Sequence, residues 1–129
     1  MPKLSPAFRS RLKAYVPAIN QEVRETLKKE ASRTVNYMKL LAPVETGELR
    51  ESIRYEFDRD TRVTLRAGDE TTTVQNTTGQ EFQNAFLQEY GSGNRPAQPF
   101  FWPAYRSEKK RMRAAITRAV ARAVKRVNR

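Results

Sequence analysis

Hydrophobic residues recur at helical spacing along a stretch near the start of the chain. They stand at positions 19, 23, 27, 31, 35, 38 and 41, with charged residues of both signs between them. This spacing keeps the apolar side chains on one face of a helix, and Pro43 disfavours helix at the residue before it. The pattern predicts a helix over residues 18–41. Residues 1–17 contain three prolines and scattered positive charge, and we expect a weakly ordered arm with one helical piece.

The pattern becomes helical again after Pro103 and continues to the end of the sequence. Met112, Ile116, Val120 and Val124 fall on one side of a helical wheel, and several alanines favour helix. Proline is tolerated in a first helical turn, so Pro103 fits the start of this element. We expect a C-terminal helix that includes residues 106–129.

Hydrophobic and polar residues alternate at period two in the middle of the chain, over residues 53–57 and 61–67. A short polar turn separates the two stretches, which predicts an antiparallel hairpin. A short helix, capped by Thr46 and ending near Ser52, is expected before it. The polar residues 69–84 favour a loop with some extended character over a third strand at 71–75. Residues 85–90 fit either a helical turn or a strand.

The order of these elements predicts one α+β domain over residues 1–129. We expect an antiparallel sheet with a long N-terminal helix, a short helix before the first hairpin and a long basic C-terminal helix. The arm at 1–17 would precede an α+β body at 18–105, and the basic helix would follow it at 106–129.

Composition excludes several kinds of chemistry. The chain of 129 residues contains no cysteine and no histidine, so disulfides, Cys/His zinc sites, thiol nucleophiles and imidazole bases are impossible. Catalysis would need paired carboxylates, a Ser-Lys dyad or an oxygen-ligated metal, and we expect neither an enzyme nor a cofactor. Because no apolar run approaches the ~18 residues that cross a bilayer, we also expect no membrane partner. The start lacks a secretory h-region, which favours synthesis in the cytoplasm.

The net charge of +11 is concentrated at one end of the chain. Residues 106–129 contain ten basic residues and a single acid, so this stretch holds +9 of the total. Three interpretations remain open: a solvated helix face, a contact for acidic surfaces of neighbouring proteins, and a non-specific contact with nucleic acid. The candidate basic surface consists of Arg111, Arg113, Arg118, Arg122, Lys125 and Arg126.

The segment "RPAQPFFWPAY", residues 95–105, combines three prolines with four aromatics. It could fill the domain's own core or provide an anchor for another subunit. Three adjacent large side chains cannot share one face of a helix or strand. We therefore expect Phe100 to face inward and Trp102 to contact a neighbour. Glu89, which lies among apolar residues, is expected to pair with Arg95 or with an arginine of the next subunit.

Three segments in register resemble one known family. "APVETGELRESI" (42–53), "AFLQEYGSG" (85–93) and "PAQPFFWPAY" (96–105) are similar to blocks of the tail-completion, or head–tail joining, proteins of long-tailed bacteriophages. The resemblance covers about residues 18–125, although Ser92 and Trp102 depart from the residues common in the family. The matching motif residues are Ala42, Pro43, Thr46, Gly47, Leu49, Ser52, Ile53 and Gly91.

The resemblance implies a structural virion protein of the phage neck, assembled in the host cytoplasm. It implies a homo-oligomeric ring, hexameric rather than twelve-fold, that joins the capsid portal region to the tail. Its neighbours would be a connector or stopper protein and a tail terminator or tail tube, and DNA would pass through its lumen. The candidate interface residues are Glu89, Tyr90, Arg95, Pro99, Phe100, Phe101, Trp102 and Pro103. A small nucleic-acid-binding protein acting through the C-terminal helix is the alternative, and a carboxylate-based hydrolase is a distant third.

Overall fold

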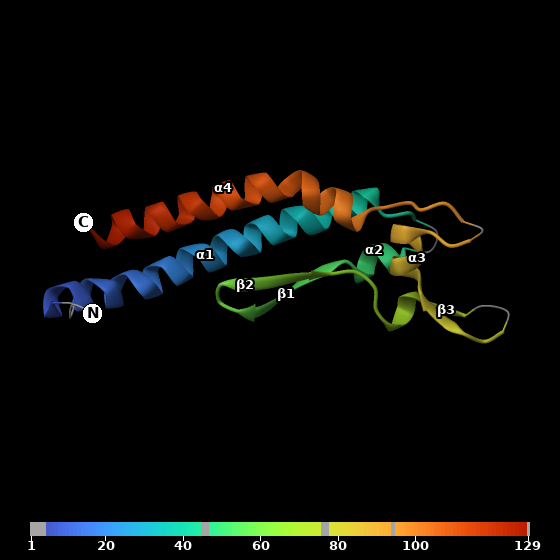
Figure 1. The fold of residues 1–129 in the computed structure, drawn as a ribbon, viewed down its shortest axis with the longest axis horizontal. Helices are drawn as coiled ribbons and strands as arrows, with labels where there is room; N and C mark the ends of the chain where they lie inside the picture. Colours follow the sequence, from blue (N-terminus) through green and yellow to red (C-terminus); the bar gives the residue numbers. More distant parts are fainter. Residues whose placement is uncertain (1–4, 45–46, 76–77, 94, 129) are drawn as a thin grey trace.

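Two long antiparallel helices lie side by side, the β1–β2 hairpin lies along α1, and the remaining small elements extend beyond the C-terminal end of α1 (Figure 1). The structure, a computed structural model, describes residues 5–44, 47–75, 78–93 and 95–128. In chain order the elements are α1 (Pro6–Leu41), α2 (Glu48–Ser52), β1 (Arg54–Arg59), β2 (Arg62–Arg66), the 3-10 helix η1 (Glu70–Thr72), β3 (Thr73–Gln75), β4 (Glu81–Gln83), α3 (Asn84–Tyr90) and α4 (Phe101–Val127). The predicted α+β class is confirmed.

Helix α1 begins twelve residues earlier than the hydrophobic pattern predicted. The Ser5 side chain accepts a hydrogen bond from the Phe8 N–H (3.2 Å), and Pro6 occupies the first turn. Pro17 removes one backbone hydrogen bond inside the helix. The helix continues through it beside the end of α4, where the Tyr15 hydroxyl donates to the Asn128 side chain. The helical piece expected within residues 1–17 is confirmed for residues 6–17, but it forms the first turns of α1 rather than part of a separate arm. Residues 1–4 lie outside the described residues.

Helix α4 also begins earlier than the boundary we placed at residue 106, and it packs against α1. The fully or nearly buried residues of α4 are all alanines: Ala104, Ala115, Ala119 and Ala123. Small side chains allow two helix axes to approach closely, and the large apolar residues of α4 are left at the margins of the contact.

The two hairpins form separate two-stranded sheets. β1 and β2 pair antiparallel with Tyr55 opposite Leu65 and Phe57 opposite Val63, which confirms the predicted hairpin. Residues 69–84, expected to be a loop, instead contain η1 and a second hairpin, in which Val74 of β3 lies opposite Phe82 of β4. The segment 85–90, left open between helix and strand, belongs to α3. Strands of three residues are too short for periodicity to reveal.

The hydrophobic core lies between four elements: the C-terminal end of α1, the short helices α2 and α3, and the first turn of α4. Its buried residues are Val35, Met38, Ala42, Leu49, Ile53, Ala85, Phe100 and Ala104. Three of them, Ala42, Leu49 and Ile53, belong to the motif that suggested the family. The described helices include none that is both long and apolar enough to span a membrane.

Candidate interaction surface

Glu89 provides the cap of α4 from a different helix. Its Oε2 atom accepts hydrogen bonds from the N–H groups of Phe100 and Phe101, and its Oε1 atom accepts one from Trp102, each at 2.9 Å. Phe100, the N-cap residue of α4, has no side-chain cap of its own. The carboxylate therefore satisfies N–H groups that a helix terminus leaves unpaired, and it lies at the positive end of the helix dipole.

The predicted pairing of Glu89 with Arg95 was wrong. Glu89 is buried, and no ion pair engages it among the described residues, whereas Arg95 is exposed and bonded through its backbone to Ser92. The segment after Arg95 instead packs on Gly91, whose φ is +78°. A Cβ at Gly91 would lie 2.8 Å from the backbone nitrogen of Ala97, so this position requires glycine. This close approach brings Phe100 to the end of α3.

The three adjacent aromatics have three different environments. Phe100 is 1% exposed in the core, Phe101 is half-buried, and Trp102 is 43% exposed. The Trp102 indole N–H donates to the Tyr90 hydroxyl (2.8 Å), and its ring meets the ring of Phe101 edge-on. The inward position of Phe100 is confirmed, while a contact of Trp102 with a neighbouring subunit stays a prediction.

The other candidate interface residues are also divided by burial. Tyr90 is 57% exposed, Arg95 and Pro99 are exposed, and Pro103 is half-buried. The rings of Tyr90 and Phe86 contact each other at a tilt of 48°, with 4.7 Å between their centroids, and Phe86 itself is 62% exposed. A hollow of about 520 Å³ lies beside this pair and is lined by Phe82, Phe86, Tyr90, Phe101 and Trp102, among others. The accessible part of the predicted surface is therefore an aromatic patch around Tyr90 and Trp102.

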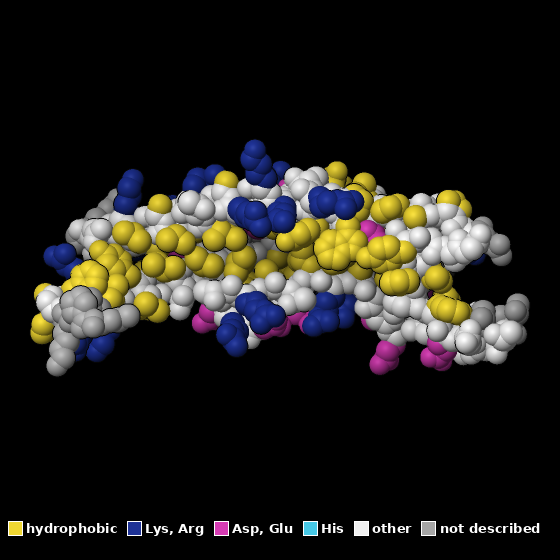
Figure 2. All heavy atoms as spheres, in the orientation of Figure 1, with side chains coloured by type: hydrophobic (Ala, Val, Ile, Leu, Met, Phe, Trp, Pro, Cys, Tyr) yellow, Lys and Arg dark blue, Asp and Glu magenta, His cyan; other side chains and the backbone are white. Residues whose placement is uncertain are grey.

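A hydrophobic band runs along most of one face of the molecule (Figure 2). Lysine and arginine side chains lie on both sides of the middle of this band. Towards the N-terminus of α1 the exposed residues Phe8, Leu12 and Val16 recur every four residues. They continue the stripe of α1 beyond the part that other elements cover. Their spacing agrees with the helical piece predicted within residues 1–17, but the local pattern did not show that this piece is continuous with the helix after Pro17.

A groove of about 480 Å³ lies in the middle of this face, between β2 and α4; we call it the β2–α4 groove. Leu27 and Ala31 of α1 contribute to it, as do residues 62–65 of β2. The α4 side consists of Phe101, Trp102, Tyr105, Lys109, Met112, Arg113 and Ile116. Trp102 lines both this groove and the neighbouring hollow, so the two form one continuous apolar surface.

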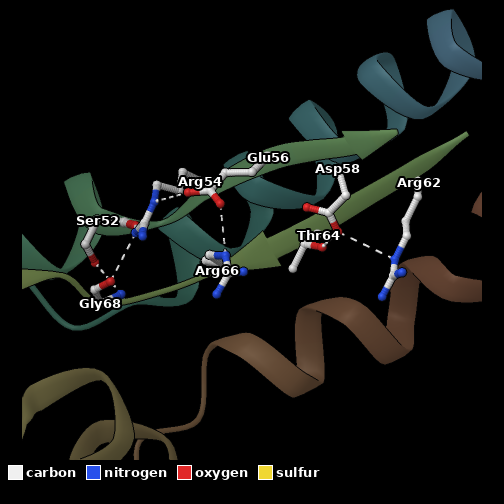
Figure 3. A network of polar contacts seen from close by, with 8 residues as sticks. All are labelled: Ser52, Arg54, Glu56, Asp58, Arg62, Thr64, Arg66 and Gly68. Carbon is white, nitrogen blue, oxygen red and sulfur yellow. Dashed lines mark hydrogen bonds and ion pairs between the residues drawn. The ribbon is translucent and has the colours of Figure 1, made fainter. Parts of the chain in front are cut away.

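The outer face of the β1–β2 hairpin is, in contrast, polar and internally paired (Figure 3). Glu56 forms ion pairs with Arg54 (3.2 Å) and Arg66 (3.0 Å). Asp58 forms an ion pair with Arg62 and accepts a hydrogen bond from the Thr64 hydroxyl. Such exposed pairs contribute about 0–1 kcal/mol each to stability. Their alternation with the apolar positions of the strands identifies the solvent side of the hairpin.

The motif around Ser52 holds the hairpin to α2. The Ser52 hydroxyl donates to the Leu49 carbonyl (2.6 Å) and accepts from the Gly68 N–H (2.8 Å). Arg54 donates to the carbonyls of Ser52 and Gly68, as Figure 3 shows. Gly47 precedes α2 with a φ of +85°. Pro43 is half-buried after α1, and Thr46, the expected cap of α2, lies outside the described residues. The described motif residues thus mainly shape and hold the fold.

The cations of α4 fall into two groups. Arg111 pairs with Glu30 (2.5 Å) and Glu108, and both Arg122 and Arg126 pair with Glu22. Glu22 and Glu30 are buried in α1, so these arginines are part of the helix pair. The second group, without an ion pair among the described residues, consists of Arg106, Lys109, Lys110, Arg113, Arg118 and Lys125. Half of the predicted basic surface is therefore engaged inside the molecule, an arrangement that none of the three interpretations included.

Among the described residues, the pKa values of Asp69 and Arg111 are shifted from their ordinary values. The hydrogen bond from the Thr71 side chain lowers the pKa of Asp69, which caps η1. Burial by itself lowers the pKa of Arg111, but the hydrogen bonds to Glu108 and Glu30 outweigh it and raise the pKa. Both shifts stabilise charges in structural contacts. Within the described residues no three acidic side chains converge in a metal-binding arrangement.

This geometry defines a small α+β protein with a large exposed apolar face. The model of the family described as "Bacteriophage HK97-gp10, putative tail-component" matches residues 7–91, about two thirds of the chain. The chain belongs to this HK97-gp10-like family of phage tail components, which confirms the resemblance to phage tail proteins. The match contains the first motif block and residues 85–91 of the second, whereas the aromatic block at 96–105 lies beyond it. No curated protein and no solved structure matches the chain.

Proposed function

We propose that this tail component is a tail-completion subunit that forms a ring between the portal region of the capsid and the tail. The observation that carries the proposal is the apolar band of Figure 2. Twelve large hydrophobic side chains in the described part of the chain are at least 36% exposed, among them Phe86, Tyr90 and Trp102. Contiguous exposed apolar surface of this kind is typical of interaction sites.

The chemistry of the surface supports a protein partner. Aromatic residues are enriched in the central parts of protein interfaces, and they supply much of the binding energy. Family membership supports other tail proteins as partners and the virion as the location. A hexamer accords with the resemblance better than a twelve-fold ring, and its assembly would take place in the host cytoplasm without catalysis.

A second function, contact with nucleic acid, is favoured by the unpaired cations of α4. Arg113, Arg118 and Lys125 are exposed and have no ion pair among the described residues. Clustered Lys and Arg suffice for non-specific binding to phosphate backbones. In a ring these side chains would face the DNA that passes through the lumen; in the alternative function they would bind nucleic acid without a ring.

Mass and DNA retention separate the two functions. The purified chain is measured by light scattering, its particles are imaged, and its retention on immobilised DNA is recorded at low and moderate salt. Closed rings with weak retention are expected. A strictly monomeric chain with strong, salt-sensitive retention would reject the ring and favour the nucleic-acid-binding protein. In the virus, loss of the protein should leave filled heads and free tails that do not join.

A further inference from the structure

One wall of the β2–α4 groove is the free edge of a strand. β1 pairs with one edge of β2, and no described strand pairs with the other edge. α4 lies across the groove from β2, and α1 contributes residues between them. Four consecutive residues of β2, 62–65, line the groove, so the backbone borders it as well as the side chains. An unpaired strand edge offers N–H and C=O groups to a further strand. The shape and chemistry of the groove therefore suit an extended segment.

The β3–β4 hairpin is such a segment, and its apolar face is partly exposed. Val74 and Phe82 lie directly opposite each other, so their side chains share one face of the hairpin. They are 40% and 39% exposed. An isolated two-stranded hairpin is marginally stable in water, and addition to a third strand removes this weakness.

The charges of the hairpin and of the groove are opposite. Residues 67–94 contain four acids and no lysine or arginine. Glu70 and Glu81 of this segment are exposed, and neither has an ion pair among the described residues. Lys109 and Arg113 line the groove and are likewise without an ion pair in the described part of the chain. Complementary charges of this kind select partners and orient their encounter.

We infer that the β3–β4 hairpin of one copy docks into the β2–α4 groove of a second copy and adds a strand to β2. The inference rests on the proposed function, because it states how the subunits of the ring meet. Figure 1 places the hairpin beyond the C-terminal end of α1 and β2 beside the middle of the helix pair. Each copy therefore offers its groove to one neighbour and its hairpin to another. A head-to-tail contact of this type closes into a ring when its rotation allows.

Cysteine cross-linking tests the contact directly, because the chain contains no cysteine. Copies with Thr64→Cys in β2 are mixed with copies carrying Gln75→Cys in β3, and a short thiol cross-linker is added. A covalent dimer is expected in the mixture and not with either variant alone. In a chain with both substitutions, a ladder of products up to the ring size is expected. Lys125→Cys, on α4 outside the groove, replaces Thr64→Cys as the matched control and should give no product.

Charge reversal tests the complementarity. Lys109→Glu with Arg113→Glu, or Glu70→Lys with Glu81→Lys, should raise the concentration for half-maximal assembly about tenfold or more at low salt. All four substitutions in one chain should restore assembly. Arg118→Glu with Lys125→Glu makes the same change in net charge outside the groove and should leave assembly unchanged. Circular dichroism verifies that every variant is folded.

The outcomes separate the docking from the ring. If rings form, but residues 64 and 75 do not cross-link and the charge reversals do not change assembly, the docking proposal is wrong and the ring proposal stands. Cross-links and charge rescue in open chains support the docking and overturn the ring. Products that stop at a dimer in the doubly substituted chain overturn the head-to-tail contact. A cross-link from Thr64→Cys only to another tail protein, or a chain that stays monomeric and unlinked up to about 1 mM, also overturns the docking.

Discussion

Replacement of Glu89 should destabilise the fold more than replacement of any exposed acid. The carboxylate accepts three backbone hydrogen bonds at 2.9 Å from the first turn of α4. Loss of a helix cap costs about 0.5–2 kcal/mol, and loss of a negative charge at a partly buried helix N-terminus costs up to about 2 kcal/mol. The Phe100 N–H is buried and would lose its acceptor, which adds about 1 kcal/mol or more. For Glu89→Ala we expect a loss of about 3 kcal/mol.

The conservative variant divides this loss into its parts. Glu89→Gln retains one carbonyl oxygen as an acceptor but removes the charge and the second acceptor. We expect it to lose about 1–2 kcal/mol, so that stability falls in the order Glu, Gln, Ala. The assay is urea-induced unfolding followed by circular dichroism, in which an unchanged slope shows that the change lies in stability rather than in the exposed surface.

The matched control is Glu81→Ala, in the exposed strand β4 close to α3. Glu81 is exposed and accepts no backbone hydrogen bond that the structure records, so its loss should stay within about 0.5 kcal/mol. If Glu89→Ala loses less than about 1 kcal/mol, or if Gln and Ala lose the same amount, the cap does not stabilise α4 as described.

Burial separates the effects of the two aromatic substitutions in the same turn. Phe100→Ala should lose about 3–5 kcal/mol of stability in a urea titration because it leaves a cavity in the core. Trp102→Ala should fold normally and fail to assemble with its partners. If the Trp102 variant unfolds instead, this side chain belongs to the core. Arg126→Gln should cost about 1 kcal/mol because it deprives the buried Glu22 of a partner. Arg118→Gln should stay within about 0.5 kcal/mol, and equal losses at the two positions would show that the pair with Glu22 does not contribute.

The long elements could be predicted from the sequence because each buries one face along its length, and that face leaves a periodic hydrophobic pattern. The apolar stripe of residues 19–41 and the alternation in residues 53–57 predicted α1 and β1 from chemistry that repeats with the element's own period. The ends of the helices were harder to predict from the sequence. Pro17 disfavours helix locally, yet α1 passes through it, because packing beside α4 is a tertiary contribution that no local pattern contains.

The candidate surface was predicted only in part. The division between Phe100 and Trp102 followed from the geometry of adjacent residues, which cannot all face one core. The role of Glu89 did not follow, since its partners are backbone N–H groups eleven to thirteen residues away. One local signal existed: the start of α4 contains no Ser, Thr, Asp or Asn at the cap, so its cap had to come from elsewhere.

Composition, periodicity and short motifs were enough to predict a basic α+β protein without thiol or imidazole chemistry and to point to a phage tail family. These properties depend on composition, on periodicity and on short blocks of residues. The pairing of α4 arginines with α1 and the choice of apolar residues that line the β2–α4 groove could be seen only in the folded molecule. Such properties depend on contacts between residues distant in sequence, and the packing of α1, β2 and α4 creates them.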